Sequence, residues 1–558
     1  MSKQIYTVLI GGKAGEGIKK AAQVIAHLAI IHNNHVFQTD DYQSLIKGGH
    51  NFSVVSMSQQ RLHNTYKSPD LVISFDKRSV QRHEAELSPG GLHFCDEADA
   101  ESEKQIPLPI TKLVKQHYPE GGNMSLASIA IFCALMRIPE QHMKDTISRE
   151  FKRNLNENVS FAVEIYRLTS NMSLELGFKL SLEQQIPAKL YTGNQLIALG
   201  AWAAGLDCYF SYPMTPASSI LHYLALKRDK LAVSAVHTES ELAAINMAVG
   251  ACFAGKRAAV GSSGGGFALM QEAFSMAGMV EAPLLCILSS RPGPATGVST
   301  FTAQEDLYFA LNQGHGEFPR IVASPDCFER AFTLASELLN LAWASQSPAI
   351  LLTEKHLSES ATNVKLPVDD LEDFFTPISD SEDYQRYQIT DSGVSPLKFP
   401  GKGNCSDSDV IKWNTNEHLE SGVRTDAAAA IVRMKDKRNR KQHTINELSK
   451  KYKRVEVYGN GESIIFAYGS TALELREAMK YHSFRLVVPV YLEPFPEEEL
   501  AEYRGKSVIV VEHSSQPNFA RFLKEKLEIK VKANILRYDG RHYSADELVE
   551  AIREAENA

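Results

Sequence analysis

Cysteine is scarce in this sequence, with seven among 558 residues. They are Cys95, Cys133, Cys208, Cys252, Cys286, Cys327 and Cys405. No two have the spacing of zinc or iron–sulfur ligands, and most lie in apolar runs such as IFCAL and LLCIL. Cysteines in such surroundings are typically reduced, buried thiols in a reducing compartment. We therefore expect no metal site and no iron–sulfur cluster within this chain.

Long apolar runs and basic stripes are also missing. No uncharged apolar stretch reaches the roughly 18 residues of a membrane helix, and the start, MSKQIYTVLIGGKAGEG, shows no signal-peptide pattern. The formal net charge of −8 argues against a nucleic-acid surface. The one basic cluster, KDKRNRK at 435–441, is typical of a solvated helix face. We expect a cytoplasmic protein that binds neither membrane nor nucleic acid.

Three catalytic signatures are absent as well. The sequence contains no G-x-S-x-G elbow, no H-E-x-x-H and no P-loop. These absences remove the basis for a serine hydrolase, a zincin or a nucleoside triphosphatase.

Strands alternate with helices along most of the chain, which predicts an α/β fold with three α/β domains. The first covers 1–185 and opens with the strand IYTVLI, and the second covers 190–365 with strands such as LDCYFSY, KRAAVGSS and PLLCILSS. Residues 366–455 are polar, but recurring aromatic residues predict an ordered wrap instead of a flexible linker. The last segment, 456–558, returns to βα units.

A glycine-rich stretch, GGKAGEG, follows the first strand and precedes a helix. With Asp40 and Asp41 downstream it suggests a dinucleotide site, but its glycines are not in G-x-G-x-x-G order, so a tight βα turn is the better interpretation. Nearby, Lys47 stands beside Gly48 and Gly49 in QSLIKGGHN. A lysine on such a loop can reach a phosphate, whereas an ordinary solvated lysine is the simpler interpretation.

Four loops of the second domain follow predicted strands: YPMTP, HTESE, SSGGGF and SSRPGPATGVST. At one edge of a parallel sheet they would line a single crevice, where open α/β sheets bind ligands. In the first loop Thr215 is predicted to be an N-cap and Pro216 the first helical residue, while Tyr212 and Pro213 stiffen the end of the strand.

The other three loops allow two interpretations each. Glu241 follows Thr238 by three residues, which fits either a capping box or a functional carboxylate. The glycines of SSGGGF fit anion binding, close approach of a flat ring, or a tight turn. Arg291 lies in a loop stiffened by proline and glycine, where it is either a surface residue or a receptor for carboxylate or phosphate.

Together these loops resemble the α subunit of 2-oxoacid:ferredoxin oxidoreductases with a γ domain fused at the N-terminus. YPMTP is similar to that family's Y-P-I-T-P, and Glu241–Ala251 reproduces E-x-A-A-I-N-M-A-x-G-A. SGGGF resembles S-G-P-G-F, and RPGPATGVST resembles R-G-G-P-S-T-G-x-P-T, with Gly265, Pro292 and Ser299 as departures. VLIGGKAGEGI and SLIKGGHN look like the γ domain. GVSPLKFPG, Asn416-Glu417-His418 and the lysine-rich run at 437–441 also match.

The resemblance implies a γ-type domain, a pyrimidine-binding domain of the thiamine diphosphate fold, and a C-terminal domain like that of transketolase. It implies that Tyr212, Pro213, Thr215, Glu241 and Gly265 bind thiamine diphosphate. Glu241 would hydrogen-bond the aminopyrimidine and promote loss of the thiazolium C2 proton. Thr215, Arg291 and Thr300 would hold the 2-oxoacid, with Arg291 on its carboxylate. Lys47 would contact a CoA phosphate.

A second half of the site is missing from the sequence. The G-D-G motif that, with a downstream asparagine pair, binds Mg²⁺ and the diphosphate is not found, and Tyr538-Asp-Gly540 is interpreted as a simple turn. The resemblance therefore implies a β-subunit partner that carries this half and an iron–sulfur cluster, with ferredoxin as acceptor, in a dimer of heterodimers. The implied reaction is reversible oxidative decarboxylation with CoA, best matched to 2-oxoglutarate. A pyruvate-type or indolepyruvate-type enzyme, a noncatalytic subunit and a Rossmann-type dehydrogenase remain alternatives.

Overall fold

The computed structural model describes residues 4–43, 48–119, 121–174, 176–180, 188–372, 376, 378–401 and 411–558. The chain divides into two compact units: Met1–Tyr191 with Ser360–Lys365, and Thr192–Glu359 with Leu366–Ala558. The described residues form sheets of eight, seven and five strands with helices between them. The predicted α/β class is therefore confirmed. The sheets do not follow the predicted segments throughout, because residues 361–364 of the second segment join the first sheet and residues 491–493 of the last segment join the second sheet.

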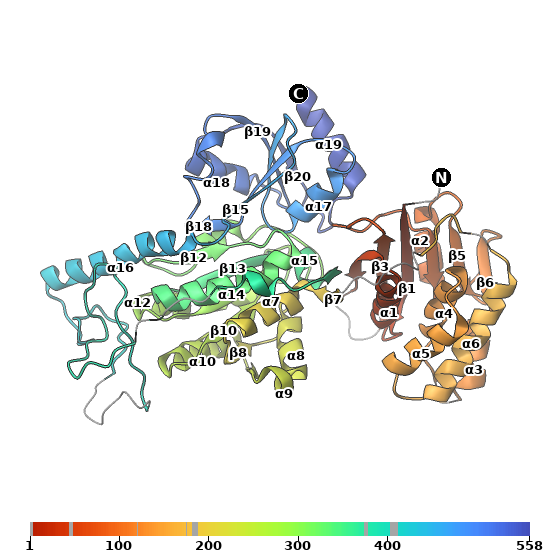
Figure 1. Cartoon of the computed structure of the whole chain (residues 1–558), viewed down its shortest axis with the longest axis horizontal. Helices are drawn as coiled ribbons and strands as arrows, with labels where there is room; N and C mark the ends of the chain where they lie inside the picture. The colour runs from red at the N-terminus through yellow and green to blue at the C-terminus, as the bar shows by residue number, and fades with distance from the viewer. Residues whose placement is uncertain are drawn as a thin grey trace. The chain divides into compact units, whose positions relative to one another are not determined.

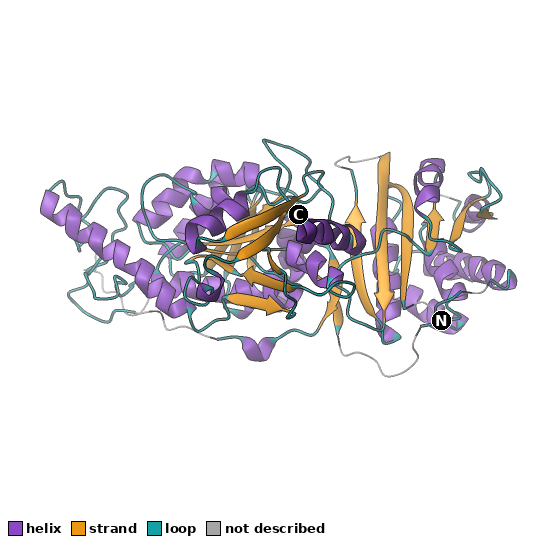
Figure 2. Ribbon diagram, turned by 90° about the horizontal axis from the view of Figure 1, so that it is seen from above, coloured by secondary structure: helices purple, strands orange, loops and turns teal. Residues whose placement is uncertain are grey.

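The first unit is built on the eight-stranded sheet, in the order β6-β5-β4-β1-β3-β2-β14-β7. Its central strand β1 is parallel to β4 and antiparallel to β3, so the sheet is mixed. Figure 2 shows the strands of the protein in orange and the helices in purple. The strands are β1 (Ile5–Ala14), β2 (His35–Asp41), β3 (Gly48–Ser58), β4 (Leu71–Ser74), β5 (Leu92–Asp96), β6 (Gln105–Leu108), β7 (Lys189–Thr192) and β14 (Ala361–Val364). The helices are α1 (Ile18–Ile31), α2 (Lys77–His83), η1 (Glu84–Glu86), α3 (Ile110–His117), α4 (Leu126–Leu135), α5 (Glu140–Glu150) and α6 (Leu155–Asn171).

The glycine-rich stretch differs from a phosphate-binding turn. Strand β1 continues through Gly11 and Gly12, which pair with β3, and the turn is confined to the residues after Ala14. Asp40 is buried and its carboxylate forms an ion pair with Lys19 at 2.9 Å. A carboxylate engaged inside the fold is a poor receptor for a ribose, so this geometry favours the structural interpretation of GGKAGEG.

The second unit contains the seven-stranded sheet, in the order β18-β12-β13-β11-β10-β8-β9 (Figure 1). All neighbours are parallel except β18, which is antiparallel to β12. The strands are β8 (Cys208–Ser211), β9 (Ser234–His237), β10 (Ala258–Ser262), β11 (Leu285–Ser290), β12 (Ile321–Ala323), β13 (Ala349–Glu354) and β18 (Tyr491–Glu493). The helices are α7 (Gly193–Ala203), α8 (Ser218–Leu226), α9 (Arg228–Leu231), α10 (Glu241–Phe253), α11 (Gly264–Leu269), α12 (Gln271–Met279), α13 (Leu307–Leu311), α14 (Phe328–Ser345) and α15 (Lys355–Glu359).

The five-stranded sheet, in the order β15-β17-β16-β19-β20, completes the second unit. Its elements are β15 (Val455–Tyr458), β16 (Ile464–Phe466), α17 (Thr471–Ala478), β17 (Arg485–Pro489), η3 (Ala501–Tyr503), β19 (Ser507–Glu512), α18 (Asn518–Leu527), β20 (Lys530–Leu536) and α19 (Ala545–Asn557). One hydrophobic cluster joins both sheets, running from Phe267 and Phe274 to Phe466 and Phe519. This shared core explains why the two sheets belong to one compact unit.

The segment between the two sheets contains η2 (Val368–Asp370) and the long helix α16 (Ala428–Ser449). Lys437 and Lys441 of this helix are buried and both contact the buried Glu281, with Lys437 Nζ 2.8 Å from each carboxylate oxygen. Arg438 pairs with Glu417 at 2.7 Å. The predicted solvated face of the basic cluster is therefore wrong for these three residues, because Glu281 and Glu417 compensate their charges inside the fold.

Aromatic residues fix the rest of this segment where it is described. Tyr387 and Phe399 are buried, and Trp413 packs against the cluster shared by the two sheets. The Tyr387 and His418 rings lie 3.8 Å apart. The prediction of an ordered wrap is confirmed over these residues. Within the described part of the chain, no helix is long and apolar enough to cross a membrane.

Candidate active site

Four polar loops meet at one edge of the seven-stranded sheet. They follow β9, β8, β10 and β11, which lie side by side and run parallel, so their carboxyl ends share one edge. Such an edge is the usual ligand site of an open α/β sheet. In the order of these strands the loops are 238–240, 212–217, 263–266 and 291–306. They overlap the four stretches singled out above, and the last loop extends six residues beyond the predicted one, which ends at Thr300.

The loop after β8 is held against Arg291. The Thr215 carbonyl accepts a 2.7 Å hydrogen bond from Arg291 Nη1, and the Thr215–Pro216 peptide is cis. Helix α8 begins at Ser218 with Ala217 at its N-cap, so the predicted cap at Thr215 and helical start at Pro216 are wrong. The backbone at 215–217 forms a turn instead, which turns the Thr215 carbonyl toward the arginine.

The first two residues of this loop, Tyr212 and Pro213, differ in exposure. Tyr212 is 41% exposed and its ring centroid lies 6.3 Å from that of His237 at the end of β9. Pro213 is half-buried. A large exposed aromatic ring next to polar loops is suited to contact a ligand or a partner chain.

Glu241 is the first residue of α10, and its side chain is 4% exposed. Ser240 is the N-cap and accepts from the Ala243 amide at 3.2 Å, while the Thr238 hydroxyl donates to the Ser240 carbonyl at 2.9 Å. The capping box between Thr238 and Glu241 is therefore wrong. Within the described residues, the buried Oε1 of Glu241 has no hydrogen-bond partner. A buried polar atom without a partner is costly and typical of a site that awaits a ligand.

Glycines of the loop after β10 make room beside this carboxylate. A Cβ on Gly266 would lie 2.6 Å from Glu241 Oε1, and a Cβ on Gly264 would lie 2.9 Å from Asp306 Oδ2. A Cβ on Gly265 would instead lie 3.5 Å from its nearest atom, the Ala295 carbonyl oxygen, which is an ordinary contact distance. Gly266, which the sequence did not single out, is therefore the glycine that Glu241 requires.

Arg291 is half-buried just after β11. It forms no ion pair with the residues that the structure describes, and its guanidinium donates a hydrogen bond to the Thr215 carbonyl. Burial lowers its pKa, opposed by the nearby Asp306 carboxylate. Asp306 in turn accepts from the Ser290 hydroxyl at 2.6 Å, and burial raises its pKa. A desolvated guanidinium with unused donors is a strong receptor for a carboxylate.

The loop that carries Arg291 folds back on itself before it reaches Thr300. The Val298 amide donates to the Pro292 carbonyl at 3.1 Å, and the Gly293 amide donates to the Glu305 carboxylate at 2.8 Å. Thr300 is 5% exposed.

The structure thus brings several predicted residues into one cluster. Arg291 contacts Thr215, and the glycine loop contacts Glu241 and the Arg291 loop. Lys47 lies outside the described residues. Ser240 and Asp306 were not predicted from the sequence. The position of Ser240 directly before Glu241 could have indicated its N-cap role. The role of Asp306 depends on its contact with Ser290, which only the folded chain shows.

Comparison with known proteins gives a consistent result. Residues 199–435 match the family described as pyruvate flavodoxin/ferredoxin oxidoreductase, thiamine diphosphate-binding, and residues 7–168 match the pyruvate ferredoxin/flavodoxin oxidoreductase family. A 2-oxoacid:ferredoxin oxidoreductase α subunit from a Sulfolobus species is 28% identical, covering 98% of this chain and 96% of its own.

Two further proteins extend this comparison. A 2-oxoglutarate synthase subunit from Archaeoglobus fulgidus is 31% identical over 36% of this chain and 55% of its own. The solved 2-oxoglutarate:ferredoxin oxidoreductase from Magnetococcus marinus is 27% identical with a TM-score of 0.88, covering 99% of this chain and 100% of that chain.

Residues 199–435, which carry the loop cluster, thus match a thiamine diphosphate-binding family of oxidoreductases. Over its full length the chain is similar, at 28% identity, to a 2-oxoacid:ferredoxin oxidoreductase α subunit.

The residues present fit part of that cofactor. Glu241 offers a buried carboxylate oxygen without a partner among the described residues, and Gly266 lets the backbone pack directly against it. These features suit one hydrogen bond to a flat ring. Among the described residues, no group of three or more His, Cys, Asp and Glu side chains could hold a metal ion.

Proposed function

We propose that this chain is the α subunit, with fused γ domain, of a 2-oxoglutarate:ferredoxin oxidoreductase. The reaction is 2-oxoglutarate + CoA + two oxidised ferredoxins giving succinyl-CoA, CO₂, a proton and two reduced ferredoxins, and it is reversible. The solved Magnetococcus marinus enzyme is described with 2-oxoglutarate, coenzyme A and succinyl-CoA bound, which supports the substrate and CoA assignments. The observation that carries the proposal is the buried, unpartnered Glu241 oxygen beside Gly266.

Glu241 would hold a proton at the aminopyrimidine ring of thiamine diphosphate. When bound, this cofactor supplies the carbon that attacks the 2-oxo group and accepts the electrons left after loss of CO₂. A carboxylate shielded from water interacts strongly with a ring nitrogen because little solvent competes. Tyr212, Pro213, Thr215 and Gly265 would form the walls around that ring.

Arg291 would bind the carboxylate next to the 2-oxo group. Its unused donors allow a charge-assisted, two-point contact, and its hydrogen bond to Thr215 fixes the guanidinium. The hydroxyl groups of Thr215 and Thr300 would orient the substrate beside the reacting carbon, which contributes through positioning.

A partner chain would complete the site. Exposed apolar side chains lie on the loops and on the helices α10 and α11 that follow them: Tyr212 at 41%, Leu242 at 50%, Met247 at 46%, Leu269 at 52% and Val298 at 50%. Apolar side chains gathered around a polar crevice are typical of a protein interface. We assign to the β partner the Mg²⁺ and diphosphate site and the iron–sulfur cluster, with ferredoxin as acceptor and a dimer of heterodimers as the assembly. Lys47 is proposed, by resemblance alone, as a CoA phosphate contact.

A pyruvate-specific or other 2-oxoacid-specific enzyme is the alternative, and a noncatalytic subunit is the second. The test is anaerobic viologen reduction by the native complex, fed 2-oxoglutarate or pyruvate, with and without CoA. Reduction that requires both 2-oxoglutarate and CoA supports the proposal. Reduction with pyruvate and CoA, but not with 2-oxoglutarate and CoA, supports the alternative substrate. If a complex that contains thiamine diphosphate and iron reduces no viologen, the noncatalytic alternative is supported.

A further inference from the structure

Gln304 joins the loop of the candidate site to the five-stranded sheet. Its side chain is 1% exposed, yet all four of its hydrogen-bonding positions are used. Nε2 donates to Glu354 Oε1 at 2.7 Å and to the Tyr468 carbonyl at 2.8 Å. Oε1 accepts from the Thr471 hydroxyl at 2.8 Å and from the His513 amide at 3.0 Å.

The main chain of Gln304 is held by the same partners. Its amide donates to the His513 carbonyl at 2.6 Å, and its carbonyl accepts from the Tyr468 hydroxyl at 3.1 Å. Of the six hydrogen bonds, five go to residues between 456 and 558. Two connections of the C-terminal sheet, the one after β16 and the one after β19, therefore fix this one residue.

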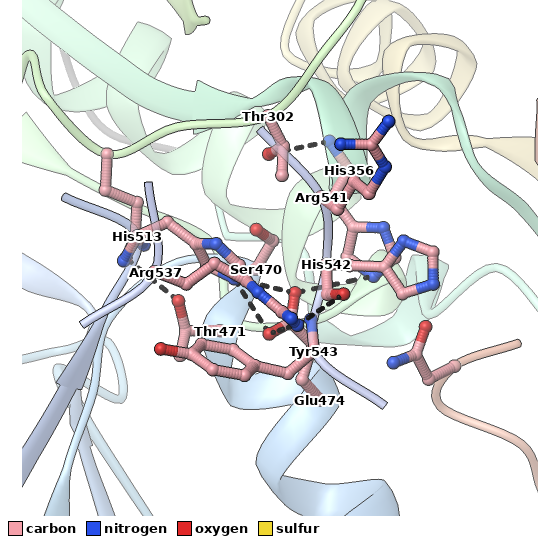
Figure 3. Close-up of polar contacts among 12 residues, drawn as sticks. Thr302, His356, Ser470, Thr471, Glu474, His513, Arg537, Arg541, His542 and Tyr543 are labelled. Atoms are coloured by element: carbon pink, nitrogen blue, oxygen red, sulfur yellow. Dashed lines mark hydrogen bonds and ion pairs between the residues drawn. The ribbon is translucent and has the colours of Figure 1, made fainter. Parts of the chain in front are cut away.

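Thr302 is anchored nearby. Its amide donates to the Gly540 carbonyl at 2.9 Å, and its hydroxyl accepts from the His356 amide at 3.3 Å. Figure 3 shows Thr302 and His356 above Thr471 and Glu474, with His513 beside them. Arg541 covers the Phe301 ring at 5.4 Å. Consecutive residues 301–304 are thus packed against the C-terminal segment.

This anchored stretch is continuous with the substrate residues. Thr300 is four positions before Gln304, and Glu305, directly after it, binds the Gly293 amide in the Arg291 loop. Asp306 then contacts Ser290 at the end of β11. A chain spans at most about 3.5 Å per residue, so a shift at Gln304 must move Thr300 or strain the intervening backbone.

We propose that Gln304 is a positioning residue of the reaction, through which the C-terminal segment sets the placement of Thr300 and the Arg291 loop. The inference rests on the proposed function, since it assumes that these residues hold the 2-oxoacid. Only a glutamine side chain provides two donors and two acceptors at this length. Substitution therefore leaves Glu354, Thr471 or a main-chain group without its partner.

The test compares wild type with Gln304→Met and Thr471→Val in the native complex. We expect Gln304→Met to raise the KM for the 2-oxoacid about 10- to 100-fold, because small displacements at a reacting centre have effects of this size. Thr471→Val, which removes one of the six hydrogen bonds, should shift KM in the same direction by a smaller factor. Exchange of the thiamine C2 proton, which depends on Glu241 and not on the 2-oxoacid loop, should be unchanged in both.

Gln346→Met is the matched control. Gln346 is also a buried amide of the second unit, bonded to Arg386, but it lies outside the candidate site. The Gln346→Met substitution should lower the thermal stability of the protein and leave the KM for the 2-oxoacid unchanged.

Thr300→Val combined with Gln304→Met should raise KM by less than the product of the two single effects, because both substitutions disturb the contact of residue 300 with the substrate. An unchanged KM in Gln304→Met and Thr471→Val, or fully multiplicative effects with Thr300→Val, would overturn the inference. Slowed C2 exchange in these variants would also overturn it. Failure of the proposed function is separate, because wild type itself would then lack activity. In that case, faster amide hydrogen exchange at 300–306 in Gln304→Met but not in Gln346→Met still tests the anchoring.

Discussion

Glu241 and Gly266 lie so close that residue 266 has no room for a side chain: a Cβ there would be 2.6 Å from Glu241 Oε1 and 2.8 Å from Glu241 Cγ, besides 2.1 Å from Ser262 Oγ. Gly266→Ala should therefore displace the carboxylate and reduce 2-oxoacid-dependent reduction at least about 100-fold. Gly250→Ala is the matched control, because Gly250 lies on α10 outside the proposed site and a Cβ there would meet no atom within 4 Å. Equal activity of both variants would contradict the close packing that the structure shows. The measurement is viologen reduction together with thiamine diphosphate content.

Glu241→Gln should abolish most activity while leaving the fold intact. The Oε1 atom forms no hydrogen bond within the described residues, so its replacement removes no stabilising contact. Loss of a proton-handling group typically costs about 10²- to 10⁴-fold in rate. We expect the C2 exchange rate to fall with kcat and the thermal midpoint to stay within a degree or two, or to rise slightly. A large drop in the midpoint would instead assign Glu241 a structural role.

Arg291→Gln should raise the KM for the 2-oxoacid about 10- to 100-fold, because hydrogen bonds to charged groups contribute about 1.5–3 kcal/mol. Arg291→Lys should lie between wild type and this variant, since a lysine keeps the charge but loses the fork. Arg228→Gln is the control, an arginine that is 76% exposed in the second unit. Steady-state kinetics over a range of substrate concentrations decide between these outcomes. Unchanged KM in Arg291→Gln would place the carboxylate elsewhere.

Glu281→Gln should destabilise the second unit. The carboxylate is 1% exposed and compensates Lys437 and Lys441, which are equally buried. Removing one member of a buried charge cluster typically costs about 3–5 kcal/mol. The urea midpoint of the second unit should fall and α16 should become sensitive to protease. Glu447→Gln, which breaks an exposed pair on the same helix, should change neither measurement.

Stability should depend on pH through Glu512. Burial raises the pKa of this carboxyl to about 7, although the Phe519 and Ala520 amides donate to it. The folded state therefore binds more protons than the unfolded state between the ordinary pKa and about pH 7. This contribution to stability is complete below pH 4.5 and is lost as the pH rises through about 7.

Thermal midpoints at pH 5 and pH 8 test this dependence. Each pKa unit corresponds to about 1.4 kcal/mol, so Glu512→Gln should be measurably less sensitive to pH than wild type. Glu525→Gln, on the exposed side of α18, should keep the wild-type profile. Identical profiles for all three proteins would show that Glu512 does not titrate in this range.

Much of the fold could be predicted from local pattern. Strand–helix alternation predicts the three sheets, and four motifs predict which loops face the site. Caps were harder: Thr215 was predicted to cap α8, but its carbonyl instead accepts from Arg291, 76 positions away. Ser240 was overlooked because Thr238 and Glu241 fit a capping box equally well by spacing. Such competition between local and distant partners is settled only in three dimensions.

Residues whose roles depend on distant contacts could not be predicted at all. Nothing near Gln304 in the chain indicates a partner at Thr471 or His513. The basic cluster at 435–441 was interpreted as solvated because Glu281 lies more than 150 positions before it. Charge alone does not reveal burial when the compensating group is remote in sequence.

The position of strand β18 affects how the chain folds during its synthesis. It comes from the C-terminal part of the sequence, yet it pairs with β12 at the edge of the seven-stranded sheet. Until residues 491–493 emerge from the ribosome, β12 would present an unpaired edge to other nascent chains. A protein truncated after α16 should therefore aggregate, and the seven-stranded sheet should be recovered only when the remaining residues are supplied.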